Sequence, residues 1–263
     1  MSVHENLLSV ADIRALLAEA EGQRLRTLLG RHGDDTRVGV ADACERARAR
    51  DRARRAERDR TGRMYELERT LYAAGFIAVA GIDEVGRGAL AGPVSAGAVI
   101  LSVDDPILGL NDSKKLSPAR REELALVIHE RALAVGVGHV AASDIDAVGL
   151  ASALRTAMHA ALQQLGPLPD HVIIDGLPLG IHASETAVVK GDAKVAAVAA
   201  ASIVAKVARD ALMREAALLH PEYGFDINKG YGTAEHIAAV AEVGPCRLHR
   251  RTFCGGGGNP TLF

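Results

Sequence analysis

Two adjacent carboxylates, Asp83 and Glu84, follow a short apolar run at residues 76–80 and lead directly into the turn Gly86-Arg87-Gly88. Glycines bound the apolar run on both sides, which favours a buried strand over a helix. Because adjacent side chains of a regular strand point to opposite faces, we expect a bend at the strand end that aims both acids at one ion. The glycines of the turn permit such a bend. This stretch predicts a site for a metal ion and a phosphate.

Two further acids occupy similar positions, since Asp175 closes the apolar run 171–174 and Asp192 follows the segment 188–191. Strand ends are where an α/β sheet brings distant acids together around a ligand. Crowded carboxylates repel each other unless a divalent cation neutralises them, and oxygen ligands favour Mg²⁺ or Mn²⁺ over zinc. Two such ions, about 3.5–4 Å apart, activate a water and stabilise the leaving oxygen of a phosphodiester. The predicted chemistry is phosphodiester hydrolysis.

Each acid also has a purely structural explanation, which the residues alone leave open. Asp83 and Glu84 could be turn residues before a glycine, and Asp175-Gly176 is an ordinary turn pair. Asp192 stands where the N-cap of an expected helix over residues 193–219 belongs, and capping could coexist with metal binding. The metal-site hypothesis therefore rests on the acids together and not on any one of them.

The elements that must position these acids begin near residue 72, where apolar runs start to alternate with helical segments in the pattern of an α/β layer. Expected strands cover residues 76–84, 94–102, 133–141, 171–175 and 186–190. Expected helices cover residues 118–131, 150–165, 193–219 and 233–242. Few residues separate the first two strands, so the first three could form an antiparallel meander before any crossover helix. We predict a mixed five-stranded sheet flanked by helices.

The first part of the chain differs from the rest, because it is rich in arginine, lacks strand-like runs and shows helical spacing of apolar residues. We expect a helical N-terminal extension at 1–71, a catalytic domain at 72–254 and a flexible tail at 255–263. Between Asp42 and Arg63 lie nine arginines and five acids. This segment is either a solvated helix laced by ion pairs or an auxiliary phosphate contact.

Composition limits the classes of protein. Of the 263 residues, 48% are hydrophobic, which is ample for a folded core. The formal net charge of −2 gives no global sign of a nucleic-acid partner, so any such surface must be a local patch. Three cysteines without a CxxC pair argue against a disulfide framework or a zinc ribbon. Without a recognisable leader or a long apolar span, we expect a cytoplasmic monomer that does not contact a membrane.

The segment 81–94, with its acids and glycine-rich turn, resembles bacterial ribonuclease HII, and later segments resemble that family in the same order. These are Asp112-Ser113-Lys114-Lys115-Leu116-Ser117, Asp175-Gly176, Lys190-Gly191-Asp192, residues 201–210, Lys229-Gly230-Tyr231 and residues 249–253. The resemblance implies a ribonuclease H-like fold and endonucleolytic cleavage of RNA in RNA–DNA hybrids, including at single ribonucleotides embedded in duplex DNA. It also implies 5′-phosphate and 3′-hydroxyl products and a role in ribonucleotide excision repair.

The resemblance further implies roles for individual residues. Asp83, Glu84 and Asp175 would bind Mn²⁺ or Mg²⁺, and Asp192 would assist the second ion or the attacking water. The backbone of Gly86-Arg87-Gly88 would meet the ribose 2′-hydroxyl, the group that distinguishes RNA from DNA.

The resemblance also gives Tyr231 a role, packing against the sugar that follows the ribonucleotide. The alternative for Tyr231 is a buried core aromatic. His249 lies in a matching segment, but a lone histidine is more often structural than a base, so we predict no catalytic role for it.

Six polar side chains are candidates for phosphate contacts. Ser202, Lys206 and Arg209 recur at i, i+4 and i+7 and so share one face of the expected helix, although a solvated helix edge is the alternative for Arg209. The remaining candidates are Lys114, Lys115 and Lys194.

The chain ends in Asn259-Pro260-Thr261-Leu262-Phe263, which resembles the short peptides that dock into replication sliding clamps, although their usual leading glutamine is absent. A disordered or self-docked end is the alternative.

Three other assignments compete with ribonuclease HII. The intact acids argue against an inactive hybrid-binding protein, Tyr231 and the helical N-terminus argue against ribonuclease HIII, and Gly86-Arg87-Gly88 argues against a DNA-junction resolvase.

Overall fold

The computed structural model describes residues 8–166 and 168–254. The terminal segment 259–263, with its predicted clamp contact, lies outside the described residues. Contacts divide the chain into two compact units, Met1–Arg60 and Thr61–Phe263.

The first unit contains α1 (Val10–Glu19), α2 (Gly22–His32) and most of α3 (Val38–Met64). A capping box starts α1, because Ser9 Oγ accepts from the Asp12 N–H while the Asp12 carboxylate accepts from the Ser9 N–H. The apolar core of this unit consists of Ile13, Leu17, Ala20, Leu25, Val40, Ala43, Cys44 and Ala47. The predicted helical nature of the N-terminal region is confirmed.

The arginine-rich segment belongs to α3, where several arginines have partners inside the first unit. Arg50 donates to the carbonyls of Leu17 in α1 and of Ala20, the residue that caps this helix. Ion pairs join Arg48 to Glu45, Arg54 to Glu21, Arg55 to Asp51, and Arg60 to Glu57. These contacts favour the ion-paired surface helix over the auxiliary phosphate contact, because they engage the guanidinium groups within the protein.

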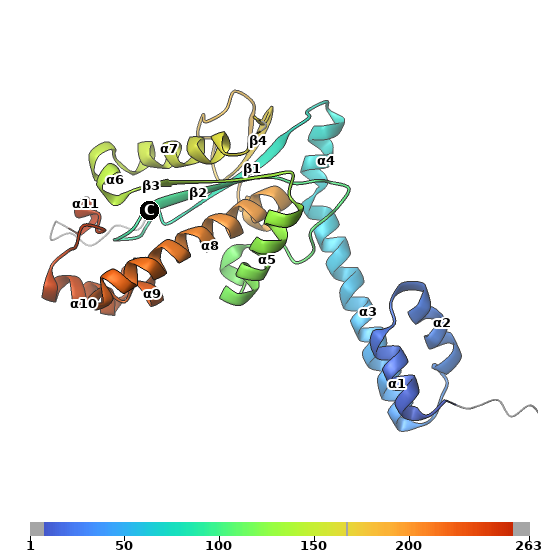
Figure 1. The fold of residues 1–263 in the computed structure, drawn as a ribbon. Helices are drawn as coiled ribbons and strands as arrows, with labels where there is room; N and C mark the ends of the chain where they lie inside the picture. The colour runs from blue at the N-terminus through green and yellow to red at the C-terminus, as the bar shows by residue number, and fades with distance from the viewer. Residues whose placement is uncertain (1–7, 167, 255–263) are drawn as a thin grey trace, which may run out of the picture. The chain divides into compact units, whose positions relative to one another are not determined.

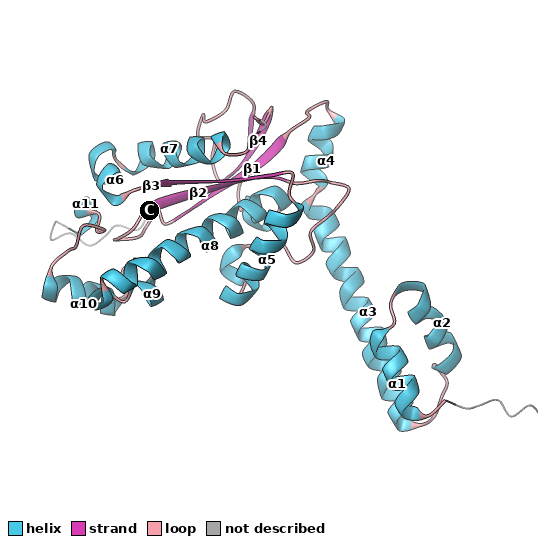
Figure 2. Cartoon of the chain, viewed as in Figure 1, coloured by secondary structure: helices cyan, strands magenta, loops and turns pink. Residues whose placement is uncertain are grey.

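The second unit is built on a mixed five-stranded sheet with the strand order β3-β2-β1-β4-β5 (Figures 1 and 2). The strands are β1 (Val79–Val85), β2 (Val94–Ile100), β3 (Ala134–Val140), β4 (His171–Asp175) and β5 (Glu185–Val188). The first three strands pair antiparallel as a meander, whereas β4 is parallel to both β1 and β5. The predicted mixed sheet is confirmed.

Helices cover both faces of this sheet (Figure 1). One face carries α6 (Ala142–Val148) and α7 (Leu150–Gln163), and the other carries α5 (Pro118–Arg131) and α8 (Ala196–Leu219). The short helices are α4 (Glu66–Ala73), α9 (Phe225–Asn228), α10 (Ala234–Val243) and α11 (Arg251–Cys254), with 3₁₀ turns at Ser113–Lys115, Gly191–Ala193 and Pro221–Tyr223. In the part of the chain that the structure describes, no helix has the length and apolarity needed to cross a membrane.

The second unit begins earlier than the boundary expected near residue 71, because α4 packs on the sheet. Leu67 and Leu71 of α4 contact a buried cluster that includes Val79 of β1 and Val198 of α8. The chain therefore joins the core of the second unit before its first strand begins.

Helix α8 approaches the sheet so closely that a side chain does not fit at two strand positions. A Cβ on Gly81 of β1 would lie 2.2 Å from the backbone carbon of Ala197, and a Cβ on Gly97 of β2 would lie 2.3 Å from the carbonyl oxygen of Ala201. The facing side of α8 consists largely of buried alanines. Glycine on the strands and alanine on the helix thus allow the two backbones to touch.

The start of α8 is capped differently from the prediction. Its N-cap residue is Val195, and Asp192 lies in the preceding 3₁₀ turn, so the predicted N-cap role of Asp192 is wrong. A carboxylate from α4 takes this role, because Glu68 Oε1 accepts from the Ala197 N–H at 2.9 Å. Burial raises the pKa of Glu68 from its usual 4.5 to about 7, although this hydrogen bond opposes the shift.

Replacing Gly81 tests the close approach of α8. We expect Gly81→Ala to lower the free energy of unfolding by roughly 1–3 kcal/mol, because the new methyl group meets helix backbone that cannot rotate away. The matched control is Gly62→Ala in α3, where an added Cβ meets nothing within 4 Å. Urea unfolding measures both variants, and equal stability of Gly81→Ala and wild type would show that the helix does not rest on the strand.

Replacing Glu68 tests the buried cap. The folded chain binds the Glu68 proton more tightly than the unfolded chain, so wild-type stability should fall as the pH rises from the unfolded pKa of 4.5 through the folded pKa of about 7. Relative to Glu68→Gln, we expect a loss of about 3 kcal/mol between pH 4 and 8. The measurement is urea unfolding of both proteins across this pH range. Parallel stability curves would contradict the assignment.

Candidate active site

Asp83 is the most deeply buried of the four predicted metal ligands, with 6% of its surface exposed. It lies on the face of β1 that α8 covers, two residues after Gly81. Its Oδ1 accepts from the Glu84 N–H at 2.7 Å, and Ser202 of α8 interacts with its carboxylate and opposes the rise in its pKa. Burial, and next the charge of Glu84, raises the pKa of Asp83 to about 8. The site therefore disfavours an ionised Asp83 unless positive charge is supplied.

Glu84 follows Asp83 on a continuous strand. β1 stays paired with β2 through Val85, so the bend predicted at the two acids is wrong, and the chain leaves the strand only at Gly86 with φ +88°. A regular strand alternates its side chains, yet the charges of Glu84 and Asp175 both act on Asp83 at this end of the strand.

An ion pair fixes Glu84, because its Oε1 lies 3.1 Å from Nη1 of Arg87. Burial raises the pKa of Glu84, while Arg87 opposes this rise and Asp175 adds to it. Arg87 itself is mostly exposed, with 59% of its side chain accessible. The Glu84 carboxylate thus interacts with the acid of β4 as well as with the turn that follows β1.

A hydrogen bond from a backbone N–H holds the turn of Asp192 against Asp175. Asp175 ends β4, and its Oδ1 accepts from the Gly191 N–H at 2.6 Å, one residue before Asp192. Lys190 adopts φ +58°, a left-handed conformation that costs energy for a residue with a side chain. Burial and two neighbouring carboxylates, one of them Asp175, raise the pKa of Asp192.

The four acids interact electrostatically, but their side chains are not arranged as a complete set of metal ligands. Among residues 8–166 and 168–254, no three His, Cys, Asp or Glu side chains are arranged to hold a metal ion. The donor chemistry nevertheless fits a hard divalent cation, because the groups are carboxylates and because burial and mutual repulsion raise the pKa of Asp83, Glu84 and Asp192. A divalent cation among them would remove this repulsion.

Arg209 does not have the predicted position. Its guanidinium is fully buried and donates to the carbonyls of Pro93 at 2.8 Å, Lys229 at 2.9 Å and Ala91 at 3.1 Å. Both earlier interpretations, a phosphate contact and a solvated helix edge, are therefore wrong. The helical spacing placed Arg209 correctly on α8, but it could not show that the chain after β1 folds over that position.

A second buried arginine, Arg250, holds the glycine-rich turn. It donates to the Gly92 carbonyl through Nε at 3.1 Å and Nη2 at 3.0 Å, and to the Arg87 carbonyl at 2.9 Å. A Cβ on Gly86 would lie 2.3 Å from the Arg209 side chain, so this position requires glycine. At Gly88, in contrast, a Cβ would meet nothing within 4 Å. Arg250 therefore supports the turn from the protein interior, whereas the space beside Gly88 is free of protein atoms.

Tyr231 lies beside this turn and is half-buried. Its backbone forms a β-bridge with Ala89. Its ring centre lies 5.2 Å from the Arg209 guanidinium carbon and 5.8 Å from Lys206 Nζ. These positions favour the surface contact over a core aromatic.

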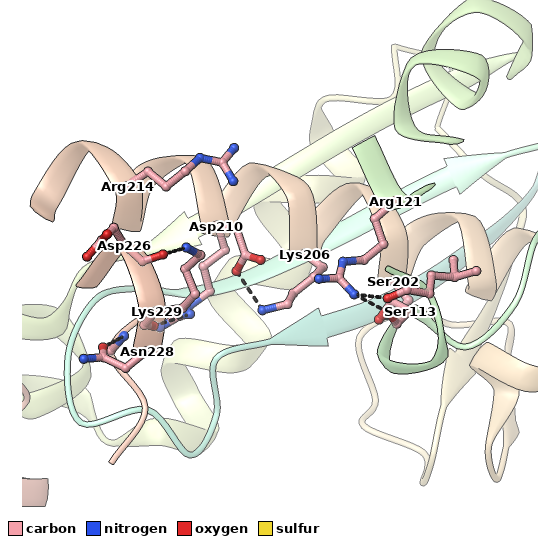
Figure 3. Close-up of polar contacts among 12 residues, drawn as sticks. Ser113, Arg121, Ser202, Lys206, Asp210, Arg214, Asp226, Asn228 and Lys229 are labelled. Atoms are coloured by element: carbon pink, nitrogen blue, oxygen red, sulfur yellow. Dashed lines mark hydrogen bonds and ion pairs between the residues drawn. The ribbon is translucent and has the colours of Figure 1, made fainter. Parts of the chain in front are cut away.

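Polar side chains form a row along α8 (Figure 3). Ser202 Oγ lies 2.9 Å from Ser113 Oγ, and Lys206 Nζ donates to Asp210 Oδ1 at 2.7 Å. Arg121 of α5 donates to the Ser113 carbonyl at 2.8 Å and so holds the 3₁₀ turn against α8. Ser202 consequently connects this turn to the Asp83 carboxylate.

The other predicted phosphate contacts lie at the surface. Lys114 and Lys115 are exposed in the 3₁₀ turn, and Lys114 opposes the rise in the pKa of Asp192. Lys194 Nζ donates to the Val189 carbonyl at 2.8 Å. These lysines place positive charge near the loop of Asp192.

Asp112 was not predicted as a site residue, although it borders the acid cluster. The charge of its side chain is, after burial, the largest cause of the raised pKa of Asp192. Asp112 also accepts from the Lys114 N–H at 2.9 Å. One signal in the sequence could have identified Asp112 as a site residue. It is the first residue of the segment 112–117, which resembles the ribonuclease family.

Two family descriptions match the sequence. "Ribonuclease HII" matches residues 80–255, and "Ribonuclease HII N-terminal domain" matches residues 9–72. Ribonuclease HII of Bacillus subtilis strain 168 is 42% identical over 248 residues, which are 94% of this chain and 97% of that protein. Ribonuclease HII of Solibacter usitatus strain Ellin6076 is 54% identical over 187 residues, covering 71% of this chain and 82% of that protein.

Solved structures share the fold. Ribonuclease H2 of Pyrococcus horikoshii OT3 has a TM-score of 0.57 at 26% identity, covering 67% of this chain and 93% of that one. RNase HII in the PCNA:RNase HII complex from Archaeoglobus fulgidus has a TM-score of 0.56 at 28% identity, covering 66% and 94%. Bst-RNase HIII in complex with Mn²⁺ has a TM-score of 0.50 at 21% identity, covering 64% and 63%, which shows the fold alone. By its family matches and its relatives, the chain belongs to the ribonuclease HII family.

Proposed function

We propose that the acids at the ends of β1 and β4 form the catalytic centre of this ribonuclease. Members of the ribonuclease HII family cleave RNA in RNA–DNA hybrids and at ribonucleotides embedded in duplex DNA, and this chain has that activity. The observation that supports the location of the centre is the electrostatic coupling of the carboxylates. Burial and Glu84 raise the pKa of Asp83 to about 8, and Asp175 acts on both of these acids.

In this proposal, Asp83, Glu84 and Asp175 hold divalent metal ions, and Asp192 assists the second ion or the attacking water. Such ions activate water and stabilise the leaving oxygen of a phosphodiester, which gives 5′-phosphate and 3′-hydroxyl products. Oxygen ligands suit Mg²⁺ and Mn²⁺, and the structure of Bst-RNase HIII in complex with Mn²⁺ supports the same choice.

The chain's own groups orient the acids. Ser202 interacts with the Asp83 carboxylate, Arg87 pairs with Glu84, and the Gly191 N–H donates to Asp175. Each contact limits side-chain rotation, so that the carboxylates need little reorganisation to receive an ion. Cations nearby, Lys114 among them, would attract the phosphates of the substrate.

The turn Gly86-Arg87-Gly88 would read the ribose 2′-hydroxyl with its backbone groups. The open space at Gly88 supports this role, because the sugar can approach the backbone there without meeting a side chain. Tyr231 would pack on the neighbouring sugar, and Lys206, 5.8 Å from its ring centre, would contact a phosphate.

Two partner assignments belong to this proposal. The terminal segment 259–263 would dock into a replication sliding clamp, and the PCNA:RNase HII complex from Archaeoglobus fulgidus supports such a partnership for a relative. The enzyme would act as a monomer in the cytoplasm on ribonucleotide-containing duplexes.

Asp83→Asn tests the catalytic centre. Because the amide is a poorer metal ligand, we expect kcat/KM to fall at least roughly 100-fold on RNA–DNA hybrid and on duplex DNA with one ribonucleotide. Cleavage is measured with Mg²⁺ and with Mn²⁺, and Asp104→Asn at an exposed position is the matched control. Undiminished cleavage by Asp83→Asn would place the catalytic centre elsewhere.

Gly88→Ala tests recognition of the sugar. The added methyl group meets no protein atom, so folding stability should be unchanged. We expect kcat/KM at a single ribonucleotide to fall at least roughly 10-fold, because the methyl group displaces the sugar from the backbone. Gly30→Ala, also in open space, serves as the control. Wild-type kinetics for Gly88→Ala would rule out a close sugar contact there.

A further inference from the structure

Two buried histidines near Tyr231 have no part in the proposed chemistry. His236 of α10 has 0% and His249 has 2% of its surface exposed. Their Nε2 atoms lie 3.0 Å apart. Two ring nitrogens at this distance must form one donor and one acceptor, since two donors would repel each other and two acceptors would share no proton.

The Nδ1 atom of each ring contacts a backbone group, and these two contacts determine the tautomers of both histidines. The Cys246 N–H donates to His249 Nδ1 at 3.0 Å, so this nitrogen carries no proton. His236 Nδ1 lies 2.9 Å from the Tyr231 carbonyl oxygen, which can only accept, so this nitrogen carries a proton. His249 is consequently protonated at Nε2, and it donates to the bare Nε2 of His236.

The surroundings keep His249 neutral. Tyr223 and Phe225 pack against the histidines, with ring centres 4.7 Å apart for Tyr223 and His249 and 5.3 Å apart for Phe225 and His236. Burial, and next the neighbouring His236, lowers the pKa of His249 to about 4. A second proton on either ring would also break the contact between them. The chain of hydrogen bonds therefore has one direction, from the Cys246 amide to the Tyr231 carbonyl.

Tyr231 lies where this chain of hydrogen bonds ends and beside the residue that follows the glycine-rich turn. The carbonyl of Gly230 accepts from the N–H groups of Leu90 at 2.8 Å and Ala91 at 3.1 Å, and Tyr231 itself bridges to Ala89. A shift of the Tyr231 backbone would therefore move both its ring and the segment after Gly88.

The geometry points to His236 and His249 as positioning residues that hold Tyr231 through a hydrogen-bond relay with fixed tautomers, and thereby set the enzyme's preference for a single ribonucleotide in duplex DNA over RNA–DNA hybrid. This inference rests on the proposed contact of Tyr231 with the sugar. The relay itself does not, because its donors and acceptors follow from backbone groups alone.

Nitrogen NMR of the wild-type protein tests the relay directly. With ¹⁵N-labelled histidine at neutral pH, we expect His249 to be protonated only at Nε2 and His236 only at Nδ1. The signals are assigned with His249→Gln and His236→Asn. A proton on His249 Nδ1 or on His236 Nε2 would overturn the relay, whatever the activity of the enzyme.

Cleavage kinetics test the positioning role. The measured quantity is the ratio of kcat/KM for duplex DNA with one ribonucleotide to kcat/KM for RNA–DNA hybrid. We expect His249→Gln and His236→Leu to lower this ratio roughly 2- to 10-fold, the effect of one lost hydrogen bond. His236→Asn should recover part of the loss, because its amide N–H can replace Nδ1–H. An unchanged ratio in both histidine variants, with wild-type melting curves, would refute the role.

Two further variants distinguish a failure of the proposed sugar contact from a failure of the positioning role of the histidines. Cys246→Ala keeps the backbone N–H, so the NMR pattern and the cleavage ratio should match wild type, and a reduced ratio would show that the thiol acts instead of the amide. Tyr231→Ala should lower the ratio at least as much as the histidine variants. If Tyr231→Ala keeps the wild-type ratio, the proposed sugar contact fails. If Tyr231→Ala lowers the ratio and the histidine variants do not, only the positioning role fails.

Discussion

The direct contact between the backbone of α8 and the strands β1 and β2 is the constraint on which the site depends. Glycine at positions 81 and 97 lets the helix rest on the sheet, and the resulting contact removes water from Asp83 two residues further along β1. The same contact brings Ser202 to the Asp83 carboxylate, and Glu68 stabilises the helix where it begins. The packing of one alanine-rich helix thus creates both the burial and the orientation of the first acid.

Burial of these carboxylates destabilises the folded state. The pKa of Asp83 rises to about 8 because of burial and then Glu84, and the pKa values of Glu84 and Asp192 rise as well. Shifts of this kind are concentrated at functional sites, and a divalent cation would convert the repulsion into attraction. The buried arginines 209 and 250 lie under the neighbouring turn and bind carbonyl groups. The chain thus separates a carboxylate-rich centre from an arginine-supported turn.

Much of this arrangement could be predicted from local patterns. Apolar runs located the strands and their final acids, and the short link after β1 indicated the antiparallel meander. The errors came from contacts between distant segments. Asp192 does not cap α8 because Glu68, far away in the chain, accepts from Ala197. Arg209 is buried because residues 91–93 and 229 fold over it, which helical spacing cannot show.

The central claim, that packing by α8 forces together acids which a cation must neutralise, is tested most directly by urea unfolding of wild type and Asp83→Asn with EDTA and with Mn²⁺. In EDTA at neutral pH, the account predicts that Asp83→Asn is more stable than wild type, because folding no longer has to protonate and bury a carboxylate that is ionised in the unfolded chain. Mn²⁺ should then stabilise wild type more than the variant. A variant that is less stable than wild type in EDTA and gains as much from Mn²⁺ would contradict the account.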